Sequence, residues 1–133
     1  DYSFDAEQFG RLLGRAFRIR DDMVEFDISS IGGKGFGNDI KEKKITLPLI
    51  FLLESLNESD RERLLGFIAR EDKTEREIKT LIEAVCESDC LDKSEEEVRH
   101  YSLLAKQHLQ LLPDNEYRKK LKELTDYLVL RKL

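Results

Sequence analysis

The sequence has no tryptophan, few aromatic residues and no long apolar run, and each of these absences limits what the protein can be. Aromatic residues make up 8% of the 133 residues, whereas charged residues make up 38%. This mixture is typical of helices with charged surfaces rather than of a β-sandwich. No apolar run approaches the roughly 18 to 20 residues that a membrane-spanning helix needs. We therefore expect a cytoplasmic protein without a transmembrane segment.

Positive charge is not in surplus either, and ligands for a zinc ion are scarce. The net charge is -5 at pH 7. Binding to a nucleic-acid backbone relies on clustered Lys and Arg, so we expect no nucleic-acid partner, although binding of a small anion stays open. Cys86 and Cys90 are the only cysteines, and neither His100 nor His108 has the spacing of a zinc ligand. We expect reduced thiols with structural roles.

What the sequence does contain is helical periodicity. Apolar residues recur at intervals of three and four along residues 5–27, which predicts a long first helix with a capping box formed by Asp5 and Gln8. The capping residues predicted for the later helices are Thr46, Ser59, Thr74, Ser94 and Asp114. Six helices without a convincing strand predict an all-α fold, with residues 1–133 forming a single helical bundle.

The first helix has two different sides. At about 100° per residue, its apolar side is centred on Phe9, Ala16 and Met23. The opposite row contains Gly10, Gly14, Arg18, Asp21 and Glu25. We therefore expect Asp21 and Glu25 to project from one face, with Asp22 rotated by about 100°. The two glycines would leave open space above these carboxylates. Carboxylates with room for water suit Mg²⁺, which usually takes one or two carboxylates plus substrate phosphates.

Residues 28–44 hold four of the seven glycines and no helical periodicity, which predicts a loop. Unpatterned loops of this length are more often functional than idle. Lys34 lies within this loop and Lys44 at its end. Carboxylates followed by glycines and lysines indicate a site for a phosphate ester that is held through a bridging divalent ion.

A series of residues in fixed order links the carboxylates to the lysines and to the next helix. They are Gly14, Ala16, Phe17, Asp21, Asp22, Gly33, Lys34, Gly37, Asp39, Lys44, Thr46, Leu47 and Pro48. This order resembles the second aspartate-rich region of the trans-isoprenyl (polyprenyl) diphosphate synthases. Residues 111–113 and 127–131 also resemble the C-terminal helices of that family. The resemblance implies the C-terminal half of the isoprenoid synthase fold, and thus a fragment that lacks the first aspartate-rich motif and is unable to catalyse alone.

The resemblance also implies an activity and roles for the site residues. The family members are Mg²⁺-dependent transferases that condense isopentenyl diphosphate with an allylic diphosphate, and they usually form homodimers. By resemblance, Asp21 would bind Mg²⁺ directly, and Asp22 and Glu25 would support the ion through water. Lys34 and Lys44 would act in catalysis by contacting the leaving diphosphate, whose developing charge the ions and lysines neutralise.

Three residues depart from the family pattern. Glu25 replaces an Asp, Arg18 replaces a Gln, and Lys43 replaces a common Gly. Arg18 could pair with the carboxylates or help to hold the diphosphate, and the sequence leaves both roles open. These departures also permit an alternative function, in which the protein is a non-catalytic subunit or scaffold of a true synthase.

Overall fold

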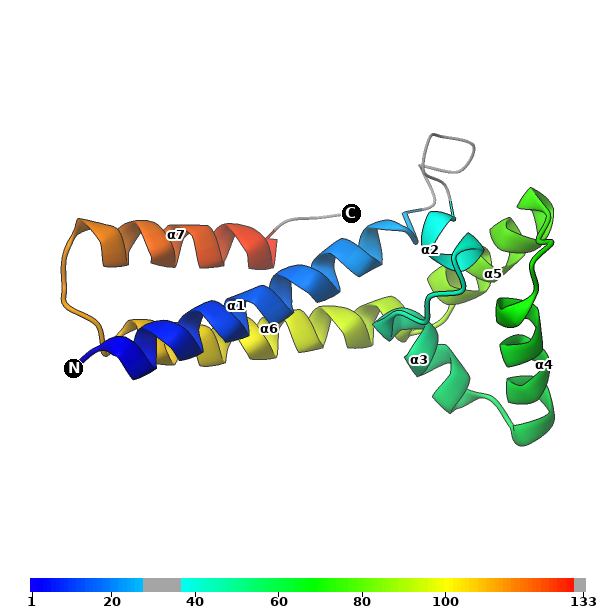
Figure 1. The fold of residues 1–133 in the computed structure, drawn as a ribbon, viewed down its shortest axis with the longest axis horizontal. Coiled ribbons are helices and arrows are strands. Elements are labelled where there is room, and N and C mark those ends of the chain that lie inside the picture. The colour runs from blue at the N-terminus through cyan, green and yellow to red at the C-terminus, as the bar shows by residue number, and fades with distance from the viewer. Residues whose placement is uncertain (28–36, 131–133) are drawn as a thin grey trace. The chain divides into compact units, whose positions relative to one another are not determined.

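The computed structural model describes residues 1–27 and 37–130. These residues form seven helices and no strand. Figure 1 labels each helix along the chain. The helices are α1 (Ser3–Val24), α2 (Asn38–Lys41), α3 (Leu47–Ser55), α4 (Glu58–Ala69), α5 (Glu75–Glu87), α6 (Cys90–Leu109) and α7 (Glu116–Leu130). The all-α fold predicted from the sequence is confirmed. In the described part of the chain, no helix combines the length and apolar character that crossing a membrane requires.

Two of the predicted helix starts are confirmed. The Thr74 hydroxyl accepts the backbone N–H of Glu77 at 3.1 Å, and the Glu77 carboxylate accepts the backbone N–H of Thr74 at 3.0 Å. This capping box begins α5. Pro48 lies in the first turn of α3, where its missing N–H costs no hydrogen bond. Thr46 precedes that helix, although its hydroxyl makes no capping hydrogen bond.

The other predicted capping residues are wrong: Asp5, Ser59, Ser94 and Asp114. In α4, the side chain of Asn57 accepts the backbone N–H of Asp60 at 2.8 Å, so the helix begins before Ser59. In α7, the side chain of Asn115 accepts the backbone N–H of Arg118 at 3.1 Å. Neighbouring Asn and Ser residues are comparable caps, and sequence spacing alone does not choose between them. The helix α2 was not predicted, since residues 28–44 were expected to form a loop.

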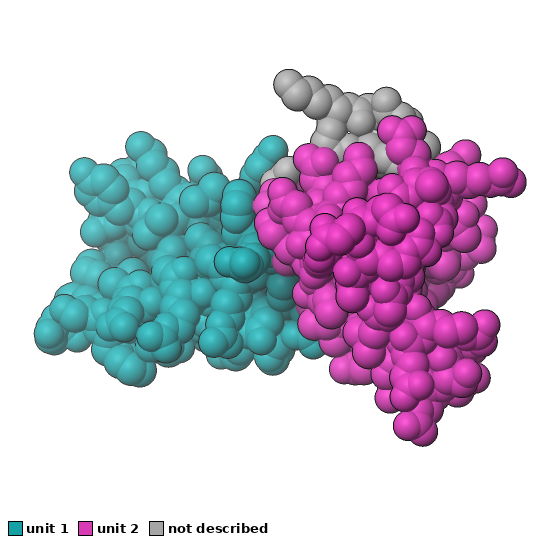
Figure 2. All heavy atoms as spheres, turned by 45° about the vertical axis from the view of Figure 1, so that its right-hand side comes forward, with its two compact units in different colours: residues 1–20, 95–133 teal, residues 21–94 magenta. Residues whose placement is uncertain are grey.

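The chain forms two compact units, which Figure 2 shows in two colours. The first unit comprises residues 1–20 and 95–133, and the second comprises residues 21–94. Both α1 and α6 contribute residues to each unit. That residues 1–133 act as a single domain stays a prediction.

In the first unit, a small apolar cluster and a buried arginine connect the helices. Phe9, Ala105 and Leu109 are buried together. Arg20 of α1 is also buried, and its guanidinium donates hydrogen bonds to Glu95 of α6, one of them at 2.7 Å. The same guanidinium donates to the backbone carbonyl of Val129 in α7 at 3.0 Å. Arg20 therefore links all three helices of this unit.

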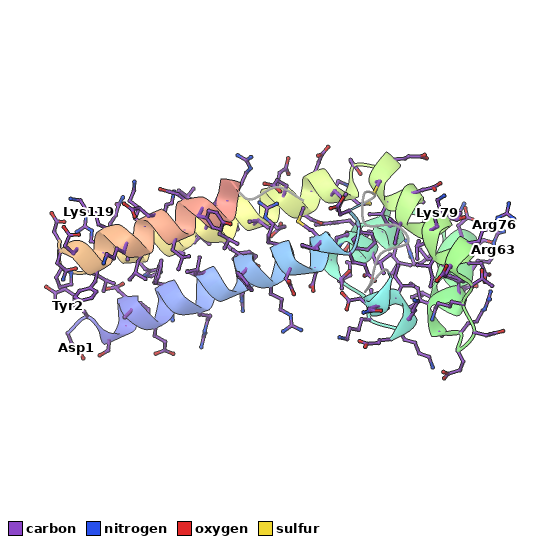
Figure 3. The ribbon with its side chains drawn as sticks, turned by 90° about the horizontal axis from the view of Figure 1, so that it is seen from above. Asp1, Tyr2, Arg63, Arg76, Lys79 and Lys119 are labelled. Carbon is purple, nitrogen blue, oxygen red and sulfur yellow. The ribbon has the colours of Figure 1, made fainter. Side chains whose placement is uncertain are left out.

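The second unit has the larger apolar core. Its nine clustered buried residues are Phe26, Ile40, Leu49, Ile68, Ile78, Leu81, Ile82, Val85 and Cys90. Exposed charged residues, including Arg63, Arg76 and Lys79, project outward from α4 and α5 in Figure 3. Gly37, which precedes α2, has φ of 68°, and a Cβ there would lie 2.5 Å from Ile78 Cγ2. The start of α2 therefore packs directly against α5.

Candidate functional site

Asp21 lies on the open side of α1, as predicted. Its side chain is exposed, and it has no hydrogen-bond or ion-pair partner among the residues that the structure describes. Nothing lies within 4 Å of the position that a Cβ would take at Gly10 or Gly14. The buried side of the helix is also as predicted, since Phe9, Ala16 and Met23 are 6%, 0% and 2% exposed.

Glu25 is half-buried, whereas Asp21 is exposed, and that the two side chains project from one face stays a prediction. The helix α1 ends at Val24, and Glu25 lies in the turn that follows. Its Oε1 accepts the backbone N–H of Ile40 at 3.1 Å. Its Oε2 is buried and has no hydrogen-bond partner in the described part of the chain.

Burial dominates the electrostatics of Glu25. It raises the pKa of Glu25 to about 7, and the hydrogen bond from the Ile40 backbone opposes this rise. The negative charges of Asp39 and Asp22 raise the pKa further. Both protonation states of Glu25 are therefore accessible near neutral pH.

Lys44 follows α2 and presents an exposed ammonium group. Its Nζ lies 3.0 Å from Glu42 Oε2 and 3.7 Å from Asp39 Oδ1. The hydrogen bond and charge of Glu42, followed by the charge of Asp39, raise the pKa of Lys44. Sequence reasoning assigned no role to Asp39, although the family pattern includes this residue. In the structure, Asp39 influences both Glu25 and Lys44.

Lys43 adopts a left-handed backbone conformation with φ of 65°. A side chain disfavours this conformation, whereas glycine takes it at little cost. The glycine that the family pattern often has at this position fits the observed backbone. The Nζ of Lys43 pairs with the carboxylate of Glu71, so this lysine is directed to an exposed partner within the second unit.

The remaining candidates differ in how far the structure defines them. Arg18 is exposed and makes no ion pair with a described carboxylate, which leaves its charge available to a ligand. Asp22 is half-buried and acts electrostatically on Glu25. Lys34 lies outside the described residues. The roles assigned to Arg18, Asp22 and Lys34 stay predictions.

The cysteines and histidines have structural contacts. Cys86 and Cys90 are free thiols, and Cys86 Sγ donates to the backbone carbonyl of Phe26 at 3.0 Å. Burial raises the pKa of the Cys86 thiol, which disfavours the reactive thiolate. In the first unit, His108 Nδ1 lies 3.0 Å from Asp5 Oδ1. Asp5 thus contacts another helix instead of capping its own.

The few carboxylates available fit a metal ion that is coordinated mainly by substrate phosphates and water. Across residues 1–27 and 37–130, no three Asp, Glu, His or Cys side chains form a cluster that could hold a metal ion. Mg²⁺ does not require such a cluster, because one or two carboxylates plus substrate phosphates and water complete its shell. The exposed carboxylate of Asp21 suits this kind of coordination.

Comparison with known proteins identifies the family. A family model described as polyprenyl synthetase matches residues 2–85, which include all the candidate site residues. The chain belongs to the polyprenyl synthetase family. It is 37% identical to the geranylgeranyl pyrophosphate synthase of Geoglobus acetivorans, over 92% of this chain and 37% of that protein.

Solved structures of the family share the fold. A decaprenyl diphosphate synthase from Rhodobacter capsulatus matches with a TM-score of 0.86 and 27% identity, over 99% of this chain and 42% of that one. A polyprenyl synthase from Caulobacter crescentus CB15, complexed with calcium and isoprenyl diphosphate, matches with a TM-score of 0.79 and 31% identity. That match covers 98% of this chain and 40% of the other. The chain therefore spans about two fifths of the length of these relatives, and it has the helical fold of isoprenoid synthases.

Proposed function

We propose that this chain supplies the second metal and diphosphate region of a trans-prenyltransferase that condenses isopentenyl diphosphate with an allylic diphosphate. The observation that carries the proposal is the presence of exposed Asp21 and exposed Lys44 in one compact unit, at positions that match the family pattern. The related Caulobacter crescentus structure contains calcium and isoprenyl diphosphate. This combination supports a site in which a divalent ion and a diphosphate bind together.

In the proposed reaction, the bond between the allylic carbon and the diphosphate oxygen breaks, and its electron pair leaves with the diphosphate. The double bond of isopentenyl diphosphate attacks the allylic cation, and the loss of a proton restores a double bond. Mg²⁺, when bound, would supply Lewis-acid stabilisation of the charge on the leaving group.

The residues of this chain would hold and orient that leaving group. Asp21 would bind the ion directly, and Asp22 would support it through water. Lys34 and Lys44 would donate hydrogen bonds to the diphosphate oxygens, and Arg18 would add a third cation. The hydrogen bond and charge of Glu42, followed by the charge of Asp39, raise the pKa of Lys44 and so favour its ammonium form. A homodimeric state and a cytoplasmic location belong to the same proposal.

A binding experiment tests the site on the 133-residue chain. Isothermal titration calorimetry with inorganic diphosphate should show binding that depends on Mg²⁺ and is lost in excess EDTA. Asp21→Asn should weaken this binding by at least about tenfold, because it removes the charged ligand of the ion. Glu96→Gln, which removes an exposed acid from α6, is the matched control and should bind like the wild type. Wild-type affinity in Asp21→Asn would remove Asp21 from the site.

A catalytic experiment tests the reaction on the native full-length protein, with labelled isopentenyl diphosphate, an allylic primer and Mg²⁺. We expect products longer than the primer, and Asp21→Ala should lower turnover by about 10²- to 10³-fold. The 133-residue chain assayed alone is expected to form no product. If the full-length protein also forms none, the alternative of a non-catalytic subunit or scaffold is favoured instead.

A further inference from the structure

Glu25 has contacts that differ from those of a residue that supports a metal ion through water. We propose that Glu25 is a positioning residue, which joins the Asp21 end of α1 to the α2 segment that leads to Lys44. It does so by accepting the backbone N–H of Ile40. This inference rests on the proposed function, because it assigns a role within the same diphosphate site.

The two carboxylates differ in their access to solvent. Asp21 is exposed, whereas Glu25 Oε1 is occupied by the Ile40 N–H and Glu25 Oε2 is buried. Mg²⁺ sheds its water reluctantly, so a carboxylate that supports it through water needs an oxygen in contact with that water. Asp21 satisfies this requirement, whereas Glu25 has one oxygen buried and the other engaged by the Ile40 N–H. The two acidic residues therefore have separate roles.

The contact made by Glu25 reaches Lys44 through α2. The first N–H groups of a helix have no carbonyl partner within the helix, and Glu25 supplies an acceptor for the one at Ile40. The side chain of Ile40 is 0% exposed in the core of the second unit, which anchors α2 there. The backbone N–H of Lys44 donates to the Asp39 carbonyl at 2.9 Å. A displacement of α2 would therefore move Lys44.

The length of the side chain explains why Glu is suited to this role. The family pattern has Asp at this position, and an Asp side chain is shorter by one carbon–carbon bond, or about 1.5 Å. The observed separation between Glu25 Oε1 and the Ile40 nitrogen is 3.1 Å. From the same backbone position, the shorter arm would take the carboxylate beyond hydrogen-bonding range. The longer side chain of Glu25 is therefore what reaches the Ile40 N–H from this backbone position.

Two variants at this position distinguish the roles. Glu25→Gln keeps the length of the side chain and an oxygen that can accept the Ile40 N–H, but it removes the negative charge. Glu25→Asp keeps the charge but loses the reach. For a positioning residue, Glu25→Asp should bind Mg²⁺ with inorganic diphosphate about fivefold more weakly than Glu25→Gln does, a loss comparable with one hydrogen bond. For a metal-supporting carboxylate the order is reversed, and that order would overturn the proposal.

Hydrogen exchange of the Ile40 amide gives a second readout that needs no metal. In metal-free buffer, Glu25→Asp should accelerate this exchange by about tenfold relative to Glu25→Gln. The control for general destabilisation is Ile82→Val, a change in the same buried core that does not touch the Ile40 N–H. This control should keep the wild-type affinity for Mg²⁺ with diphosphate.

The two readouts separate the inference from the function on which it rests. Equal exchange of the Ile40 amide in Glu25→Asp and Glu25→Gln would overturn the positioning role. An equal loss of affinity in Ile82→Val and Glu25→Asp would also overturn it, because destabilisation alone would then explain the effect. If the wild-type chain fails to bind diphosphate with Mg²⁺, the proposed function fails, and the exchange of Ile40 alone decides the role of Glu25.

Discussion

The two compact units differ in the buried contacts of their described residues. The second unit, residues 21–94, buries a cluster of nine residues, including Ile40 and Ile78. The first unit has a buried cluster of Phe9, Ala105 and Leu109, and an ion pair between buried Arg20 and Glu95 connects its helices. Apolar burial is non-directional, whereas a buried ion pair depends on the geometry of both partners. We therefore expect packing defects to affect the second unit most, and charge defects the first.

The exposed apolar residues reinforce this difference. In the first unit, Phe4 is 64% exposed and Phe17 is 54% exposed. In the second unit, Ile50 and Leu65 are 38% and 39% exposed. The first unit thus leaves more of its large apolar side chains in solvent. Asp21, Glu25 and Lys44 all belong to the unit with the larger apolar core.

The largest expected effect comes from disturbing the packing between α2 and α5. Gly37→Ala would add a Cβ 2.5 Å from Ile78 Cγ2 at a backbone φ of 68°. Backbone strain and overpacking together should lower the free energy of unfolding by about 3 kcal/mol. Denaturant unfolding followed by hydrogen exchange should locate the loss in the second unit.

The control for Gly37→Ala is Gly66→Ala. Gly66 lies within α4 and has nothing within 4 Å of the position of a Cβ. This change should raise the free energy of unfolding by about 0.5 to 1 kcal/mol, because alanine is the better helix former. Equal effects of the two substitutions would contradict the close packing of Gly37 on α5.

A smaller effect should follow from breaking the ion pair of the first unit. Glu95→Gln removes the charge opposite Arg20, whose side chain is 2% exposed. Complete loss of a buried partner costs about 3 to 5 kcal/mol, but the Gln oxygen still accepts a hydrogen bond, so we expect about 2 kcal/mol. Hydrogen exchange should accelerate in α7 more than in α5. The exposed neighbour provides the control, Glu96→Gln, and an equally fast exchange in that variant would argue against a special role for the pair.

A third effect tests how the second unit tolerates a buried acid. Burial raises the pKa of Glu25 from an ordinary 4.5 to about 7. The Glu25 carboxylate therefore binds a proton more readily in the folded protein than in the unfolded chain. The stabilisation from protonated Glu25 is therefore complete below about pH 4.5 and is lost as the pH rises through about 7. Because solvent screens this partly exposed group, we expect a loss of about 1 kcal/mol.

Urea unfolding in metal-free buffer at about pH 5 and about pH 8 measures this loss. Other groups also titrate in this range, so the informative quantity is the difference between the wild type and Glu25→Gln. The variant should lose the part of the pH dependence that comes from Glu25. The same pH dependence in both proteins would show that the buried carboxyl does not titrate as expected.

Local patterns account for what the sequence predicted correctly. The burial of Phe9, Ala16 and Met23 follows from helical periodicity, and the Thr74 capping box follows from a spacing of three residues. Exposed Asp21 lies on the same regular helix. These features depend only on the geometry of one helix and its first turn. Residues of this kind can be placed before any packing is known.

The features that sequence reasoning missed depend on contacts between distant parts of the chain. Glu25 bonds to Ile40, 15 residues later, and Arg20 bonds to Glu95, 75 residues later. Periodicity indicates neither where α1 ends nor which partner a polar side chain finds. The inward orientation of Glu25, the helix α2 and the burial of Arg20 were unpredictable for this reason. The family pattern contained a signal at Lys43, because it often has glycine where the backbone is left-handed.

The smallest expected effect concerns the backbone strain at Lys43, the residue before Lys44. Lys43 has φ of 65°, which costs a residue with a side chain about 1 to 2 kcal/mol. Its ion pair with Glu71, whose side chain is 87% exposed, stabilises the fold too little to offset that strain. Lys43→Gly relieves the strain but also increases the freedom of the unfolded chain, so we expect a net stabilisation of only about 0.5 kcal/mol in urea unfolding. Lys43→Ala is the matched control, since it loses the same ion pair and keeps the strain. If the glycine variant is no more stable than the alanine variant, the left-handed conformation at Lys43 carries no measurable cost.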